Sequence, residues 1–526
     1  MPTDTRAPEL DPADRRTDSE ASVAASSRRP VITIMHASVG SGHRAAAMAI
    51  AQAVEQLRGD SGVPADVEVD VLDVLDFGRI HFDGNKTAAA FTGATRPIYD
   101  VTWRYTLTGR FLWGGGSAWS RIMFGSFNEY VEQKRPLAVI CTHITAANTA
   151  VGARMMTDVE YPIVCIPTDY EIEGFWPHKE ADLFCVASEF MAETLRPRLV
   201  PEANIAITGI PVRGGFEDDA FDRKSVLNQF GLPVNKKIVL VLAGASLPQP
   251  YVRFRMAIEQ TLPYLRRFDD MHFVFLPGKD HEYARNLKAL FSGMKLDNAT
   301  VLDYVSDMAS LMRASNLAIL KSGGLTVTEC LCARLPMLLV GKSYGQEKAN
   351  TVMLTSFGAS LHATTSRELV LTLERIHRYP EALDALLIGA KALRKPYAAE
   401  DIVRATMEQT KIERNHQKHF IEFYWGEKAR AYSIGVMKPC CEFANRASTL
   451  RNQLFGSAGT KAAFTTIGLI ELVNFEQRHA WDGLDNQLSD TVALFDDDRL
   501  MWIQIDRNNL EFTAIVRINK PGSVQN

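Results

Sequence analysis

Short apolar runs recur along most of the chain, and a longer stretch of helical character follows each of them. Early runs include VITIMH, LAVICT and PIVCIPTD, and later ones include KIVLVLAGA, HFVFLPG and LAILKSGG. Continuous runs rich in β-branched residues are typical of strands buried on both faces, as in a parallel sheet covered by helices. The pattern therefore predicts the α/β fold class.

The series of runs divides at TGIPVRGGFEDDAFDRKSVLNQFGLPVNKK, a polar segment with several Pro and Gly residues that ends where a new strand begins at Lys237. Two doubly wound halves joined by a short linker leave a cleft that faces the carboxyl ends of both sheets. We expect residues 31–215 to form the first domain and residues 216–417 the second. Residues 1–30 are predicted to be a disordered leader.

After residue 418 the pattern changes to alternating, strand-like segments, with a hairpin turn predicted at DRNNL. We therefore expect residues 418–526 to form an additional small α+β domain. Its sequence holds no recognisable chemistry, so packing or homo-oligomerisation is the simplest role for it.

Composition excludes several classes of protein. The 526 residues carry 58 basic and 62 acidic side chains, a net charge of -4 that does not favour nucleic-acid binding. Seven scattered cysteines without metal-ligand spacing indicate a reducing cytoplasm and no metal site. No segment approaches the roughly 20 apolar residues that span a bilayer, so any membrane contact is expected at the inner surface.

The first run breaks into SVGSGHRAAA, a loop of small residues that opens a helix. Gly40-x-Gly42 fits the dinucleotide fingerprint, but the acidic residues Asp70 and Asp73 follow later than that motif requires. His43 stands at the lip of the predicted cleft, where an imidazole that titrates near neutrality could take a proton from a hydroxyl. A helix-capping role for His43 remains open.

A second polar cluster follows LAILKSGG. A turn of small residues at a helix N-terminus is suited to holding a phosphate, and a carboxylate about one and a half turns later could accept hydrogen bonds from both hydroxyls of a ribose. The polar segment GQEKAN could contact a sugar or a base. These candidate binding residues are Ser322, Gly323, Gly324, Thr326, Glu329, Gln346, Glu347 and Asn350.

The motifs SVGSGHRAAA, PTDYEIEGFW, TGIPVR, SGGLTVTE and GQEKAN, in this order, resemble those of the monogalactosyldiacylglycerol synthases and the bacterial processive diacylglycerol glycosyltransferases. The resemblance covers residues 31–407. It implies a GT-B fold of two Rossmann-like domains, an acceptor in the first and a UDP-sugar donor in the second. It also implies metal-independent hexosyl transfer, without a cofactor, that inverts the anomeric carbon.

Roles for individual residues follow partly from the resemblance, by position, and partly from the chemistry of a displacement that needs a base and positive charge beside the leaving phosphate. His43 is the candidate base, with Asp169 in the facing PTDY loop as the second catalytic candidate. Arg213 and Lys321 are expected near the donor phosphates, together with Gly244 in the loop after the first strand of the second domain. The candidate acceptor residues are Gly40, Gly42, Glu173, Trp176 and Trp113.

The sequence departs from the family's motifs at two places, and these departures leave alternative functions open. Glu173 stands where many relatives have histidine, and the donor loop reads LAGASLPQPY, with two prolines in place of a glycine-rich sequence. A GT-B nucleotide-sugar epimerase or hydrolase, and a non-catalytic nucleotide-sugar-binding protein, therefore remain alternatives. The aromatic and arginine-rich segment 97–124, which includes Trp113, is typical of either a lipid-surface contact or an ordinary core helix.

Overall fold

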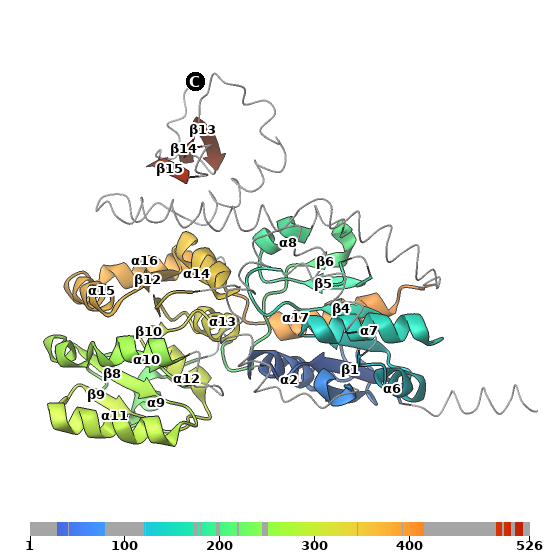
Figure 1. The fold of residues 1–526 in the computed structure, drawn as a ribbon, viewed down its shortest axis with the longest axis horizontal. Helices are drawn as coiled ribbons and strands as arrows, with labels where there is room; N and C mark the ends of the chain where they lie inside the picture. Colours follow the sequence, from blue (N-terminus) through green and yellow to red (C-terminus); the bar gives the residue numbers. More distant parts are fainter. Residues whose placement is uncertain are drawn as a thin grey trace, which may run out of the picture.

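The computed structural model describes residues 29–39, 41–78, 120, 123–172, 176–178, 180–195, 200–217, 220–244, 251–343, 346–391 and 393–414, and the strands 491–496, 499–506 and 511–518. Two α/β domains and a small antiparallel sheet make up this part of the chain (Figure 1). The predicted α/β fold class is confirmed. Among the described helices, none has both the length and the apolar character needed to cross a membrane.

The first domain is built on a six-stranded sheet in the order β2-β1-β3-β4-β5-β6, and every neighbouring pair is parallel. All six residues of β1 are buried, as its continuous apolar sequence predicts. The strands are β1 (Val31–His36), β2 (Glu68–Asp73), β3 (Ala138–Cys141), β4 (Ile163–Cys165), β5 (Leu183–Cys185) and β6 (Ile205–Ala206).

The second domain holds another parallel sheet, in the order β12-β11-β10-β7-β8-β9. The chain leaves β7 toward one edge and returns on its other side at β10, so the strand order reverses between these two strands. In open α/β sheets, ligands bind outside the carboxyl ends of the strands at such a reversal. The strands are β7 (Lys237–Leu242), β8 (Met271–Leu276), β9 (Ala299–Val301), β10 (Leu317–Leu320), β11 (Met337–Val340) and β12 (Ser360–Ala363).

Helices connect the parallel strands and cover the sheets. The first domain contains α2 (Ser41–Gln56), α6 (Phe127–Lys134), α7 (Ile144–Met156) and α8 (Glu189–Leu195), with short 3-10 turns η2 (Val74–Phe77) and η4 (Glu202–Asn204). The remaining helices are α9 (Arg223–Gln229), α10 (Val252–Glu259), α11 (His281–Met294), α12 (Met308–Ala314), α13 (Gly324–Cys332), α14 (Gln346–Ser356), α15 (Ser366–Arg378), α16 (Glu381–Ala390) and α17 (Ala398–Thr410), with the 3-10 turn η6 (Leu262–Arg267).

The last helix, α17, returns to the first domain and lies among its elements (Figure 1). Ile402, Val403 and Met407 belong to the same buried apolar cluster as Ile34 and Ile50. Past the helix end, Arg414 donates to Asp182 at 2.9 Å, and the same carboxylate pairs with Arg154. The second half of the chain thus completes the hydrophobic covering of the first sheet.

A separate buried apolar cluster runs through both domains. It joins Tyr170, Ile172 and Trp176 of the first domain to Val327 and Leu331 of the second. Continuous apolar contact of this kind holds the carboxyl ends of the two sheets against each other.

Strands β13 (Thr491–Asp496), β14 (Arg499–Asp506) and β15 (Glu511–Ile518) pair antiparallel in that order. The two strands predicted on either side of DRNNL are therefore confirmed. Residues 418–490 of the predicted third domain lie outside the described residues.

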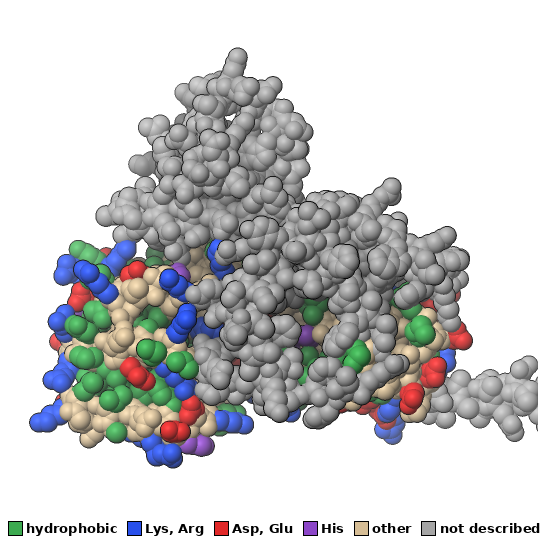
Figure 2. Space-filling model, in the orientation of Figure 1, with side chains coloured by type: hydrophobic (Ala, Val, Ile, Leu, Met, Phe, Trp, Pro, Cys, Tyr) green, Lys and Arg blue, Asp and Glu red, His purple; other side chains and the backbone are tan. Residues whose placement is uncertain are grey.

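The surface of the second domain is mixed in character. On the face drawn in Figure 2, Lys and Arg side chains rim this domain, and apolar side chains lie between them. Its exposed apolar side chains include Met256 and Ile388, which are 54% and 65% exposed.

Candidate functional site

His43 lies in the first turn of α2, where the strand order of the first sheet reverses between β1 and β3. Its Nδ1 atom is 2.9 Å from the carbonyl oxygen of Thr142, the residue after β3, and the Thr142 hydroxyl donates to the His43 carbonyl at 3.0 Å. Because a carbonyl oxygen only accepts, Nδ1 carries the ring proton in this contact and Nε2 keeps its lone pair. The fold therefore holds His43 in the tautomer that a base requires.

The surroundings of His43 also favour its neutral form. Burial lowers the pKa of His43 below its ordinary value, although the charge of Asp169 and the Thr142 carbonyl act in the opposite direction. The His143 ring meets the His43 ring edge-on at 4.7 Å, and its own pKa is held far lower by burial and by the charges of His43 and His36. Near neutral pH the His43 imidazole is thus unprotonated and able to accept a proton.

Asp169 lies in the loop after β4, next to Thr168, whose hydroxyl is 3.0 Å from Nδ1 of His43. Burial raises the pKa of Asp169, while a 2.6 Å hydrogen bond from Asn350, the charge of His43 and the backbone N–H of Gly324 lower it. Glu347 adds a repulsion that raises it further. The pKa values of both candidate catalytic groups are thus shifted, and shifted pKa values are common at functional sites.

The glycine turn of the second domain, at the reversal between β7 and β10, has two dissimilar residues. A Cβ atom placed on Gly323 would meet no other heavy atom within 4 Å among the described residues. A Cβ atom on Gly324 would lie 2.1 Å from the carbonyl oxygen of Thr168 in the first domain. Gly323 therefore borders open space at the N-terminus of α13, whereas Gly324 allows the two domains to touch.

Charged and polar groups around this turn are paired with one another. The Lys321 ammonium bonds the carboxylate of Glu347, and it lies 5.5 Å from the centre of the Tyr251 ring. The buried Ser322 hydroxyl donates to the backbone carbonyl of Glu347 at 3.0 Å. Lys321 is therefore held in place by Glu347 rather than extended into solvent.

Glu329 lies on α13, about one and a half turns after the glycine turn, and is partly exposed. Burial raises its pKa to about 7, and the positive charge of Arg213, from the segment between the domains, acts against this rise. Arg213 itself is exposed. At neutral pH Glu329 is therefore divided between its two protonation states, each of which can accept a hydrogen bond from a hydroxyl group.

The other predicted site residues occupy varied positions. Thr326 and Gly42 are partly exposed, and Trp176 is buried against Phe184. Gly244, after β7, is pressed against the loop after β8, because a Cβ atom on it would lie 2.5 Å from the backbone nitrogen of Gly278. Gly40, Trp113, Glu173 and the side chain of Gln346 lie outside the described residues.

Several residues of this site were not predicted. Thr142 and His143 follow β3 in the segment CTHIT, and Thr168 and Tyr170 flank Asp169. A sequence signal for the first pair existed, because polar residues at the end of a buried strand beside the reversal point are well placed for a ligand.

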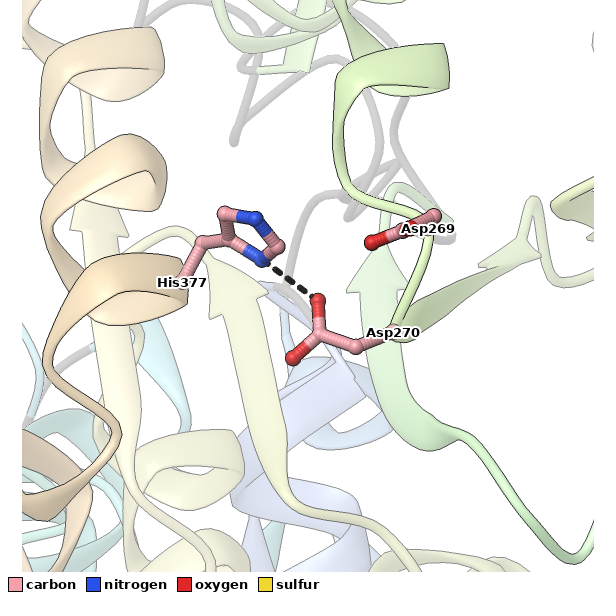
Figure 3. Close-up of side chains that lie close together, drawn as sticks. All are labelled: Asp269, Asp270 and His377. Atoms are coloured by element: carbon pink, nitrogen blue, oxygen red, sulfur yellow. Dashed lines mark hydrogen bonds and ion pairs between the residues drawn. The ribbon is translucent and has the colours of Figure 1, made fainter.

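Away from the contact between the domains, Asp269, Asp270 and His377 bring potential metal-ligand atoms within 4.8 Å of one another (Figure 3). Asp270 accepts from His377 at 2.6 Å through one oxygen and from Lys237 at 2.8 Å through the other. Although burial opposes this, these two hydrogen bonds hold the pKa of Asp270 below its ordinary value. Since both oxygens are occupied and an ammonium group is adjacent, the cluster is an ion-pair network at the amino ends of β7 and β8.

Comparison with known sequences gives two family matches. Residues 43–212 match the family described as monogalactosyldiacylglycerol (MGDG) synthase, and residues 238–383 match the glycosyltransferase family 28 C-terminal domain. A processive diacylglycerol beta-glucosyltransferase of Bacillus thuringiensis is 26% identical over 263 residues, which is 50% of this chain and 66% of that protein. One of Staphylococcus saprophyticus is 27% identical over 267 residues, 51% of this chain and 65% of that protein. The chain thus spans slightly less than two thirds of these relatives' own length.

Two solved structures are also similar in part. MurG of Acinetobacter baumannii is 17% identical, with a TM-score of 0.46, over 71% of this chain and 98% of that one. UDP-GlcNAc 2-epimerase of Neisseria meningitidis, bound to UDP-GlcNAc, is 14% identical, with a TM-score of 0.48, over 72% of this chain and 100% of that one. The first domain of the chain therefore matches the monogalactosyldiacylglycerol synthase family, and the second domain matches the glycosyltransferase family 28 C-terminal domain.

Proposed function

We propose that the protein is an inverting glycosyltransferase that moves a hexose from a UDP-sugar to a hydroxyl group of a lipid or lipid-like acceptor, of the diacylglycerol type. The observation that carries the proposal is that two different groups of polar residues, one from each domain, lie close together at the carboxyl ends of the two sheets. His43 and Asp169 approach from the first domain, and the glycine turn and Glu329 approach from the second. The names of the relatives, diacylglycerol beta-glucosyltransferases, support this choice of acceptor.

In the proposed reaction, the acceptor hydroxyl attacks the anomeric carbon on the face opposite the nucleotide. A new carbon–oxygen bond forms while the bond from the anomeric carbon to the phosphate oxygen breaks, and UDP leaves with the electron pair. The hydroxyl proton passes to Nε2 of His43, and the carboxylate of Asp169 stabilises the resulting imidazolium. Inversion at the anomeric carbon follows from this single displacement.

The donor is proposed to bind the second domain. The open backbone at Gly323 and the N-terminus of α13 would hold a phosphate group, because unpaired N–H groups and the helix dipole attract anions. Glu329 would accept hydrogen bonds from the ribose hydroxyls, and Arg213 would face the negative charge that develops on the leaving UDP. Lys321, which forms an ion pair with Glu347, would add positive charge near the donor phosphates.

Lipid acceptors imply a protein that works at a membrane surface, and we propose a peripheral position on the inner face of the cell membrane. The segment expected to make this contact, around Trp113, lies outside the described residues. Replacement of Trp113 and Trp119 by Ser should lower co-sedimentation with anionic vesicles if this segment touches lipid. Equal co-sedimentation of variant and parent would indicate that the segment belongs to the protein core and does not contact lipid.

Transfer is tested by incubating the protein with UDP-glucose or UDP-galactose, with and without diacylglycerol vesicles, and measuring UDP and glycolipid. The proposal expects both products only when vesicles are present. Vesicle-independent conversion of the UDP-sugar would instead identify an epimerase or hydrolase. Binding of UDP without conversion under either condition would identify a non-catalytic binding protein.

A further inference from the structure

Asn350, in α14 of the second domain, is fully buried at the contact between the domains. Its Oδ1 atom accepts the backbone N–H of Tyr170 at 2.8 Å. Its Nδ2 atom donates to Oδ1 of Asp169 at 2.6 Å and to the backbone carbonyl of Ser322 at 3.0 Å. Both N–H donors of the amide are therefore used inside the protein.

The orientation of this amide is determined by its partners. A backbone N–H can only donate, so the atom that faces Tyr170 must be the amide oxygen. A backbone carbonyl can only accept, so the atom that faces Ser322 must be the amide nitrogen. The second N–H of Asn350 then necessarily points to Asp169.

The contacts of Asp169 come from both domains. The second domain supplies the amide of Asn350 and the backbone N–H of Gly324, and both donate to the carboxylate. The first domain supplies His43, whose positive charge attracts the Asp169 carboxylate. Glu347, on α14 of the second domain, repels this carboxylate, and the ion pair between Glu347 and Lys321 reduces the repulsion. The close fit of Gly324 against Thr168 brings these donors within reach.

We propose that Asn350 is a positioning residue for Asp169, through which the second domain orients the carboxylate of the candidate catalytic pair in the first domain. Asn350 then serves the reaction without binding the donor, unlike the role that its motif suggested, because it has no N–H left to offer a ligand. The inference deepens the proposed function and rests on it for the part that Asp169 plays in transfer. Contact between the domains completes the catalytic pair.

The test compares two variants of Asn350 with a matched control. Asn350→Asp keeps the size of the side chain but cannot donate to Asp169 when ionised, and Asn350→Ala removes the donors without adding charge. The control is Thr328→Val, because the Thr328 hydroxyl is 3.1 Å from the Tyr170 hydroxyl across the same contact but does not touch Asp169. Melting temperatures identify any variant that fails to fold.

Three measurements are made on each folded variant: UDP affinity by calorimetry, the pH profile of the single-turnover rate, and a carbon-13 NMR titration of the Asp169 carboxyl, assigned with Asp169→Asn. For Asn350→Asp we expect a rate lower by about 10–100-fold, an acidic limb displaced to higher pH, and UDP affinity within about threefold of the parent. Asn350→Ala should displace the limb in the same direction by less, because it adds no charge. Thr328→Val should leave the pH profile and the Asp169 titration unchanged.

A tenfold or greater loss of UDP affinity in both Asn350 variants would overturn the inference and make Asn350 a donor ligand. An Asp169 titration that stays at the parent position in Asn350→Ala would also overturn it. If the parent protein transfers no sugar, the proposed function fails, while the NMR titration still decides whether Asn350 positions Asp169.

Discussion

The two sides of the contact between the domains differ in how they use their polar groups. In the first domain, His43 and Asp169 are partly buried, and the loss of solvent around them moves the pKa values of both. In the second domain, Gly323 borders open space, and the side chains of Lys321 and Glu347 form an ion pair with each other. Groups with altered pKa values are suited to proton transfer, and an open turn of backbone N–H groups is suited to holding an anion. This difference fits the proposed function, in which the first domain transfers the proton and the second binds the donor.

The largest expected effect concerns the first domain. His43→Ala should lower the single-turnover rate by about 10²–10⁴-fold, the usual contribution of a general base, and leave UDP affinity nearly unchanged. Calorimetry and rapid-quench kinetics measure the two quantities. If His43 only capped α2, the change would instead cost about 1 kcal/mol of stability with turnover intact, and Asp169 would become the leading candidate for the base.

The matching change in the second domain is Glu329→Ala. We expect UDP affinity to fall by about 10–100-fold, because one or two hydrogen bonds to the ribose are lost. Titration calorimetry on the folded variant measures this. Unchanged UDP affinity would remove the ribose assignment and, with it, the division of roles between the domains.

The two neighbouring glycines provide a matched pair of substitutions. Gly324→Ala should destabilise the domain contact by about 1–3 kcal/mol, because the added methyl group would press on the Thr168 carbonyl 2.1 Å away. Gly323→Ala has room for its methyl group and should leave the melting temperature unchanged while weakening UDP binding. Equal melting temperatures for the two variants would contradict the close contact at Gly324.

The smallest expected effect is a pH dependence of stability from Glu329. Its pKa of about 7 lies above the ordinary value of 4.5, so between these pH values the folded protein binds more protons and stability falls as pH rises. The side chain introduced by Glu329→Gln does not titrate. The free energy of unfolding of this variant, relative to that of the parent, should therefore increase from pH 5 to pH 8. Since the side chain is partly exposed, we expect about 1–2 kcal/mol at pH 8, measured as a rise in melting temperature. A constant difference across this range would exclude the raised pKa.

Local sequence was sufficient for much of the fold. The runs VITIMH and KIVLVL predicted buried parallel strands because their apolar residues are continuous, and β1 and β7 confirm this. The hairpin strands around DRNNL were predicted from alternation alone. The motifs also indicated His43 and Asp169 as candidate catalytic residues and Glu329 as a candidate binding residue.

Contacts between distant parts of the chain could not be predicted in this way. Asn350 and Asp169 are 181 positions apart, and His43 and Thr142 are 99 apart, so no local pattern connects them. Gly324 fitted the pattern of a phosphate turn, which carries no information on a neighbouring domain. The return of α17 to the first sheet depends on apolar residues that would have suited either domain.

The central claim is that His43, together with Asp169, removes the acceptor proton. The most direct test is the single-turnover rate as a function of pH, measured with UDP-glucose and diacylglycerol vesicles for the parent and for His43→Ala. Because burial holds the pKa of His43 below its ordinary value of 6.5, the parent rate should rise with pH, and the midpoint of this rise should lie below pH 6.5. His43→Ala should be slow and should lose this rise. A folded His43→Ala variant that keeps both the parent rate and its pH dependence would contradict the account.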